Sequence, residues 1–120
     1  MNKKRVNDWL LIAKEALKET GIATSDGKIN KTFRGQISSF GAAVIMGSLP
    51  AAVAFFSEQG GSSVERNKLI QAIYYCMFKV IKDPKYILQY VCENNSNELK
   101  EKFTDASIAV KLAMNFYDLV

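Results

Sequence analysis

Apolar and polar positions alternate along most of this chain with the three- and four-residue spacing typical of amphipathic helices. In the first such segment the apolar positions are Val6, Trp9, Leu10, Ala13, Ala16 and Leu17. We expect this helix to end at Gly21, because glycine is suited to the left-handed cap of a helix. The sequence GIATSDGKIN, residues 21–30, is rich in turn-forming side chains and predicts a loop.

The next stretch departs from this pattern, because it is apolar on nearly every side. The 23 residues Gly35–Ser57 carry no charge and read GQISSFGAAVIMGSLPAAVAFFS. Their number would suffice for a bilayer, which needs about 20 apolar residues. Gly47 and Pro50 interrupt the stretch, however, and a proline inside a helix removes a hydrogen bond. We therefore predict two helices too short to span a membrane, at about 31–46 and 50–58, joined as a buried central elbow.

Small and bulky side chains alternate within this elbow. Alanines and glycines let helices approach closely, and we expect Gly41 to lie at a tight helix crossing. The bulky apolar residues expected to fill the space between helices are Phe40, Val44, Leu49, Val53, Phe55 and Phe56.

Three further helices are predicted after the elbow. Ser62 and Glu65 have capping-box spacing and mark the start of the first. Asp83 is suited to cap the second and Pro84 to begin it, while Thr104 is a candidate cap inside the last. The expected buried positions are Leu69, Ile70, Ile73, Met77, Val80 and Ile81 in the first, Ile87, Leu88 and Val91 in the second, and Leu99, Phe103, Ala106, Ala109, Val110, Ala113 and Phe116 in the last.

These segments predict an all-α fold without strands: a compact single-domain bundle of about six helices over residues 1–120. The hydrophobic content of 48% and the charged content of 23% are typical of a globular domain. The opening segment regains charge at Lys14 and Glu15, too early for a secretory signal, so we expect a cytoplasmic protein.

The residue types present leave little room for catalysis. The chain contains no histidine, which excludes histidine bases, catalytic triads and most transition-metal sites. Cys76 and Cys92 do not make a zinc site of the usual composition, and we expect both to be reduced thiols in the core. No glycine-rich phosphate loop is present either. We therefore expect no enzymatic activity, no cofactor, no metal and no small-molecule substrate.

The positive charge is concentrated in two blocks. Residues 1–35 carry eight Lys or Arg against four Asp or Glu, and residues 64–90 carry five against two. Residues 91–120 carry three against five, and the whole chain has a net charge of +4. Such blocks suit a phosphate backbone, although lysine-rich helices also serve simply to keep a protein in solution.

Two segments together resemble the small helical subunit of type III-B CRISPR effector complexes, the Cmr ribonucleoprotein family. Within FRGQISSFGAAVIMGSLPAAVAFF the matching residues are Ser39-Phe40-Gly41-Ala42, Gly47, Leu49 and Ala54-Phe55. In the C-terminal DASIAVKLAMNFYDLV they are Ala109, Lys111, Leu112 and Ala113. Ser48 is inserted between the matching glycine and leucine, and Pro50 replaces an ordinary helix former. The resemblance extends to the order of the helices over most of the chain.

The resemblance implies a non-catalytic protein that takes part in antiviral defence. Copies of such subunits stack into a minor filament beside the backbone that carries the guide RNA. There they line the groove for single-stranded target RNA, while other subunits supply the nuclease activity. The expected partners are therefore the other Cmr-type subunits, further copies of the chain, and the guide RNA–target RNA duplex through its backbone.

Binding along an RNA backbone requires Lys and Arg side chains that reach phosphates. The candidates, in order of preference, are Lys28, Lys31 and Arg34, then Lys79, Lys82 and Lys85, then Lys3, Lys4 and Arg5. Lys111 interrupts an apolar helix and is a candidate for partner contact, or for a stem that covers the core. Base stacking and core packing are alternative uses for Tyr74, Tyr75, Tyr86 and Tyr90.

An alternative function is a helical protein–protein adaptor that binds no nucleic acid. Such a protein would bury the elbow against its own partner and show no salt-dependent binding of RNA.

Overall fold

The computed structural model describes residues 1–58 and 65–120, and it confirms the all-α fold. The helices in these ranges are α1 (Lys3–Glu19), α2 (Thr32–Met46), α3 (Leu49–Ser57), α4 (Asn67–Phe78), α5 (Pro84–Glu93) and α6 (Asn97–Ala113). A short 3-10 helix (Met114–Phe116) and two strands, β1 (Lys28–Ile29) and β2 (Asp118–Leu119), complete the described fold.

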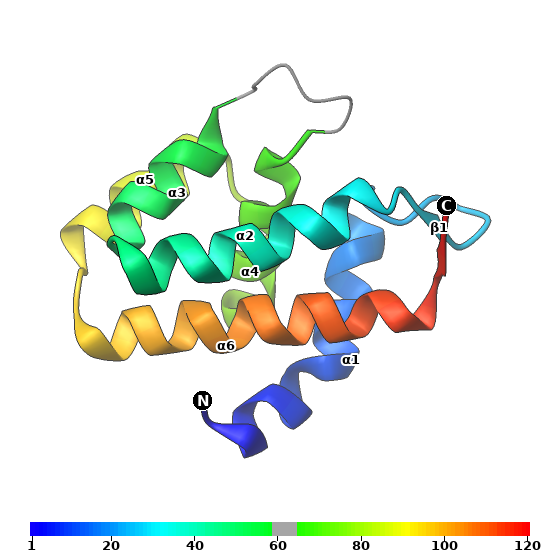
Figure 1. Ribbon diagram of the computed structural model, residues 1–120, viewed down its shortest axis with the longest axis horizontal. Coiled ribbons are helices and arrows are strands. Elements are labelled where there is room, and N and C mark those ends of the chain that lie inside the picture. The colour runs from blue at the N-terminus through cyan, green and yellow to red at the C-terminus, as the bar shows by residue number, and fades with distance from the viewer. Residues whose placement is uncertain (59–64) are drawn as a thin grey trace.

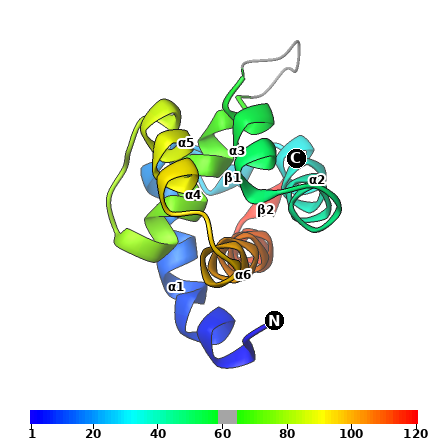
Figure 2. The same ribbon diagram turned by 90° about the vertical axis from the view of Figure 1, so that its left-hand side faces the viewer.

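Helix α6 is the centre of the bundle, because it packs against α1, α2 and α4. Helices α2 and α6 run side by side and α1 crosses α6, while α3 packs on α5 (Figures 1 and 2). The largest side chains sealed between these helices include Phe40 of α2, Phe103 of α6 and Leu17 of α1, together with Leu69, Ile70 and Ile73 of α4.

Local capping signals set several of the helix ends as the sequence predicts. Helix α1 ends at Glu19, and Gly21 adopts a left-handed φ of +77° just beyond it. The Asp83 carboxylate accepts a hydrogen bond of 2.8 Å from the Lys85 N–H, and Pro84 is the first residue of α5. The Ser48 hydroxyl accepts from the Ala51 N–H at 3.2 Å at the start of α3. The Asp83 and Ser48 side chains each satisfy a backbone N–H that the helix itself leaves without a partner.

The elbow has the predicted boundaries, with a break at 47–48, but it is not fully buried. Helix α2 buries Phe33, Ile37, Phe40 and Val44 along one face. Its opposite side exposes Ile45 by 68% and Met46 by 88%, and α3 exposes Phe55 by 56%. In a domain of this size the elbow helices have neighbours on one side only, so part of an all-round apolar surface meets solvent.

The crossing at Gly41 is also looser than expected. A Cβ atom at this position would lie 4.0 Å from the Ser107 Oγ, its nearest neighbour, which is an ordinary contact distance. The approach between α2 and α6 therefore does not require a glycine there.

Two short strands contradict the expectation of a strand-free fold. Strands β1 and β2 pair in parallel, with Lys28 opposite Asp118 and Ile29 opposite Leu119. The Val120 N–H donates to the Ile29 carbonyl at 2.9 Å, and the Lys31 N–H donates to the Val120 carbonyl at 3.0 Å. A strand of two residues shows no alternation in the sequence, so periodicity could not reveal it. The pairing fixes the C-terminal residues beside the start of α2.

The predicted buried stripe of the fourth helix is wrong at its end. Helix α4 stops at Phe78, and Lys79 adopts a left-handed φ of 56°, which turns the chain outward. Val80 and Ile81 therefore lie in the connection to α5 and are each 40% exposed. The predicted cap at Ser62 lies outside the described residues.

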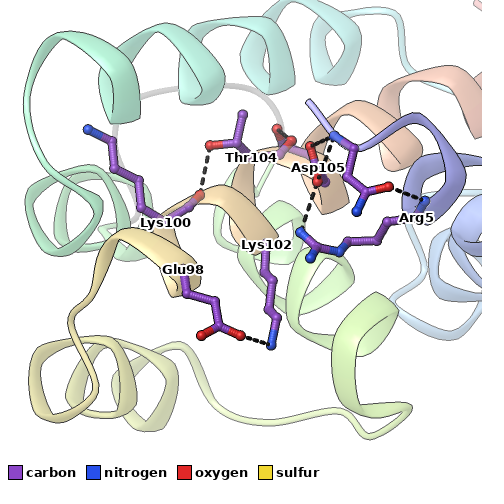
Figure 3. Close-up of polar contacts among 8 residues, drawn as sticks. Arg5, Glu98, Lys100, Lys102, Thr104 and Asp105 are labelled. Carbon is purple, nitrogen blue, oxygen red and sulfur yellow. Dashed lines mark hydrogen bonds and ion pairs between the residues drawn. The ribbon is translucent and has the colours of Figure 1, made fainter.

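The last helix and one cysteine also differ from expectation. Thr104 starts no new turn: its hydroxyl donates to the Lys100 carbonyl at 2.8 Å within a continuous α6 (Figure 3). Phe116 lies beyond the end of α6 and is 50% exposed. Cys76 is buried as predicted, and burial raises the pKa of its thiol to about 12. Cys92 is exposed, because it lies on the outer side of α5.

Candidate nucleic-acid interface

One group of predicted cations lies at the connection between α4 and α5. We name the region from the last turn of α4 to the end of α5, residues 74–94, the α4–α5 corner. Lys79 and Lys85 are exposed and Lys82 is half-buried. Within residues 1–58 and 65–120, these three side chains form no ion pair. The connection runs along the outside of the molecule (Figure 2). Its lysines are therefore open to a phosphate backbone.

The backbone holds these lysines in place. The left-handed Lys79 donates its N–H to the Tyr75 carbonyl at 2.7 Å and so closes α4. The Gln71 side-chain amide donates to the Lys82 carbonyl at 2.9 Å and fastens the connection to α4. Lys85 lies in the first turn of α5, where Asp83 is the capping carboxylate.

An aromatic cluster lies at the same corner, and one of its rings contacts Lys82. Tyr74 packs against Phe78, Tyr86 and Tyr90, with ring centroids 4.6, 6.2 and 5.8 Å apart. The Lys82 Nζ lies 4.7 Å from the centroid of the Tyr86 ring, a cation–π contact. A hollow of about 300 Å³ borders this cluster and is lined by Tyr86, Gln89, Tyr90, Glu93 and Asn94.

The four predicted tyrosines divide between the core and the surface. Tyr74 and Tyr75 are buried, whereas Tyr86 is 48% exposed and Tyr90 is half-buried. Burial raises the pKa of Tyr74 to about 12, so its phenol is neutral at physiological pH. A hydrogen bond to the Glu15 carboxylate raises the pKa of Tyr75 to about 12. Tyr86 is thus the most exposed of the four tyrosines, and Phe78, which sequence reasoning missed, adds a ring that is 42% exposed.

The first-choice cations gather at the start of α2, but two of them already have partners. The Arg34 guanidinium donates to the Asn115 side-chain oxygen at 2.9 Å. The Lys28 Nζ lies 3.6 Å from the Asp26 carboxylate, and both side chains are more than half exposed. Lys31 is exposed and precedes the first turn of α2. This group, residues 28–34, is a second and partly neutralised basic surface.

The N-terminal cations are mostly paired. The Arg5 guanidinium donates to the Asp105 carboxylate at 3.0 Å, and Asp105 is completely buried (Figure 3). The Lys4 Nζ lies 2.8 Å from the Asp8 carboxylate, and that hydrogen bond raises the pKa of Lys4. Arg5 therefore links α1 to α6, and its charge is already paired with that of Asp105.

Lys111 borders a groove between α2 and α6. The groove is lined by Ile37, Ser38, Gly41, Ala42, Ile45, Thr104, Ser107, Ile108 and Lys111. Lys111 is half-buried, and the neighbouring Leu112 is 42% exposed. A charged head above an apolar groove fits both of the roles that the sequence left open, partner contact and coverage of the core.

The described residues hold no group of three His, Cys, Asp or Glu side chains that could bind a metal ion. Among the helices of the same residues, none combines the length and the apolar character needed to cross a membrane. Comparison with known proteins adds no relative, since no protein-family model, no curated protein and no solved structure matches the chain.

Proposed function

We propose that this chain is a non-catalytic subunit of a type III-B CRISPR effector complex, in which it binds single-stranded RNA through phosphates. The family assignment rests on the resemblance of the elbow and the C-terminal segment. The RNA-binding role rests on one observation above the others: among the described residues Lys79, Lys82 and Lys85 form no ion pair, and Lys82 lies beside the exposed ring of Tyr86.

Lysines interleaved with exposed aromatic rings are what sequence-tolerant binding of a single strand requires. The lysines attract successive phosphates, and every base can stack on an aromatic face whatever its identity. The basic surface at 28–34 would continue the contact on a second side of the protein. In the assembled complex the partners would be the other subunits, further copies of this chain, and the guide RNA–target RNA duplex.

A second candidate function is protein–protein adaptation without RNA. It is favoured by the α2–α6 groove, which the exposed Ile45 lines, and by the further exposed apolar side chains of Met46 and Leu112 on the same two helices. Exposed apolar side chains that gather on one surface often mark a protein interface. Stacking of copies within an effector complex would use such a surface as well. The two functions are therefore distinguished by whether the protein binds RNA.

The test is recovery of the tagged, full-length chain from its native host, with the bound proteins and RNA identified by mass spectrometry and sequencing. A multi-subunit complex that carries short guide RNAs is the expected result. Recovery of a single protein partner without RNA would refute the proposal and favour the adaptor.

A variant with Ala at Lys79, Lys82 and Lys85 then tests the contact surface in the same experiment. We expect it to enter the complex and retain less target RNA. The matched variant with Ala at Lys28, Lys31 and Arg34 tests the second basic surface in the same way.

A further inference from the structure

A hollow of about 500 Å³ lies between the N-terminal half of α2 and the C-terminal half of α3. Its lining is formed by Thr32, Gly35, Gln36, Ser39, Phe55, Phe56 and Arg66. Pockets for small ligands have volumes of about 300–1,000 Å³, so this hollow is of suitable size for one small planar group. None of the sequence-predicted sites includes it.

One wall of the hollow is a firmly held pair of aromatic rings. The Phe56 ring is buried and packs edge-to-face on Phe40, with centroids 5.3 Å apart. Phe55 packs on Phe56 at 5.7 Å and yet remains 56% exposed. Phe55 is therefore held against the core by Phe56 while part of its surface remains open to solvent.

Arg66 is held over this wall. Its guanidinium lies 4.3 Å from the Phe55 ring centroid, and its side chain is only 16% exposed. The Nε–H donates to the Glu58 carbonyl at 3.2 Å, and the Glu58 carboxylate lies 3.9 Å from the guanidinium. Because this carboxylate balances the charge, the hollow favours a neutral planar group over a free anion.

The opposite wall is polar. It carries the side chains of Thr32, Gln36 and Ser39, and the Ser39 hydroxyl donates to the Gly35 carbonyl at 3.1 Å within α2. Among the described residues, and apart from its chain neighbours and the backbone of its own helix, no atom lies within 4 Å of the point that a Cβ of Gly35 would occupy. The exposed Lys31 directly precedes Thr32 in the chain.

We infer that this hollow binds one unstacked nucleobase, stacked on Phe55 beside Arg66, with its phosphate toward Lys31. Nucleobases are neutral, planar and rimmed with hydrogen-bonding groups, which matches an aromatic wall that faces the hydroxyl oxygens of Thr32 and Ser39. The inference rests on the proposed RNA binding and adds to it a site for a single base. A free nucleotide offers the same chemistry as a nucleotide within a strand, and the experiment distinguishes these two sources.

The experiment titrates the full-length, isotope-labelled chain with uridine or adenosine monophosphate, and separately with a short single-stranded RNA and a ribose-phosphate oligomer without bases. We expect both RNA and nucleotides to shift the NMR signals of the Thr32, Gly35 and Ser39 amides and of the Arg66 Nε–H. The oligomer without bases should leave the Arg66 signal in place. Shifts with nucleotides but not with RNA would identify a free nucleotide as the ligand. This result would refute the RNA-binding role and leave the nucleobase site standing.

The decisive variant is Phe55→Leu, which keeps an apolar side chain and removes the ring. Stacking on an aromatic side chain is worth about 1–3 kcal/mol per base, so affinity for RNA should fall by about 5- to 150-fold. Arg66→Lys, which keeps the charge and loses the plane, should lower affinity as well. The matched control is Phe116→Leu. Phe116 is 50% exposed and its ring centroid lies 4.9 Å from the Lys14 Nζ, but it does not line this hollow.

Each remaining result counts against one proposal or both. Equal RNA affinity of Phe55→Leu and the parent would refute the nucleobase site and leave the RNA-binding role standing. An equal loss with Phe116→Leu would also refute it, because the effect would then follow any exposed ring. Absence of binding by both RNA and nucleotides would overturn both the site and the RNA-binding role. Circular dichroism of each variant verifies that the fold is intact.

Discussion

The N-terminal segment and the α4–α5 corner each carry three candidate cations, and they differ in what those cations already touch. At the N-terminus Arg5 binds the buried Asp105, and Lys4 binds Asp8. At the corner Lys79, Lys82 and Lys85 have no carboxylate partner among the described residues. Equal formal charge thus produces a structural link in one region and an open basic surface in the other.

The largest expected effect follows from breaking the link at the N-terminus. Arg5→Ala leaves the Asp105 carboxylate buried, and among the described residues the Asn2 N–H, at 3.3 Å, is then its one long-range donor. Loss of one partner of a buried ion pair costs about 3–5 kcal/mol, and we expect about 3 because Arg5 is 24% exposed. Urea unfolding measures the change in the free energy of unfolding.

Two controls define this effect. Lys3→Ala, at an exposed position without an ion pair in the described chain, should leave the unfolding midpoint nearly unchanged. Adding Asp105→Asn to Arg5→Ala should recover part of the lost stability, because no charge is then left buried. If Arg5→Ala unfolded at the same urea concentration as Lys3→Ala, Arg5 would be an ordinary surface cation and the contrast between the regions would fail.

The second effect concerns RNA affinity at the corner. Each phosphate contact to a single strand contributes about 0.7 to the slope of log affinity against log salt concentration. Ala at Lys79, Lys82 and Lys85 should therefore lower the magnitude of that slope by about 2. Fluorescence anisotropy with a labelled single-stranded RNA at several salt concentrations measures it. A slope equal to that of the parent would remove the corner from the interface.

The third effect separates charge from stability at one residue of the corner. Lys79 has a left-handed φ of 56°, a conformation that costs a non-glycine residue about 1–2 kcal/mol. Lys79→Gly should therefore raise the free energy of unfolding by up to about 1 kcal/mol while RNA affinity falls. Lys79→Ala should lower affinity equally without the gain in stability. A loss of stability in the glycine variant would show that the Lys79 side chain supports the fold.

The comparison also explains which features could be predicted from sequence. The helix ends at Gly21, Gly47 and Pro84 depend on residues adjacent in the chain, and they were predicted correctly. The pairing of Arg5 with Asp105 joins residues 100 positions apart, so no local pattern could reveal it. The pairing of β1 with β2 likewise joins residues 28–29 to residues 118–119, which meet only in three dimensions.

The exposure of apolar side chains was the other feature that the sequence did not predict, and the candidate sites depend on it. The pattern placed Val80, Ile81 and Phe55 in the core, because an apolar residue at helical spacing reads as buried. The left-handed turn at Lys79 and the one-sided packing of the elbow place all three at the surface. The hollow beside Phe55 could not be predicted from the sequence, because its lining comes from α2, from α3 and from Arg66. The one readable signal was Arg66, a cation close to the uncharged elbow.

The smallest expected effect tests the paired region directly. Replacing Lys3 and Lys4 by Ala removes two formal positive charges, whereas the corner variant removes three. Lys4 already forms an ion pair with Asp8, so its charge is partly neutralised before any RNA binds. Screening at about 0.1 M salt limits the reach of the remaining charge to about 10 Å. We expect RNA affinity to change by less than about twofold, because neither lysine belongs to the basic surfaces where we place phosphate contacts. The same anisotropy titration measures it beside the corner variant. A loss as large as that of the corner variant would mean that sequence charge, and not the pairing of each side chain, determines where this protein binds RNA.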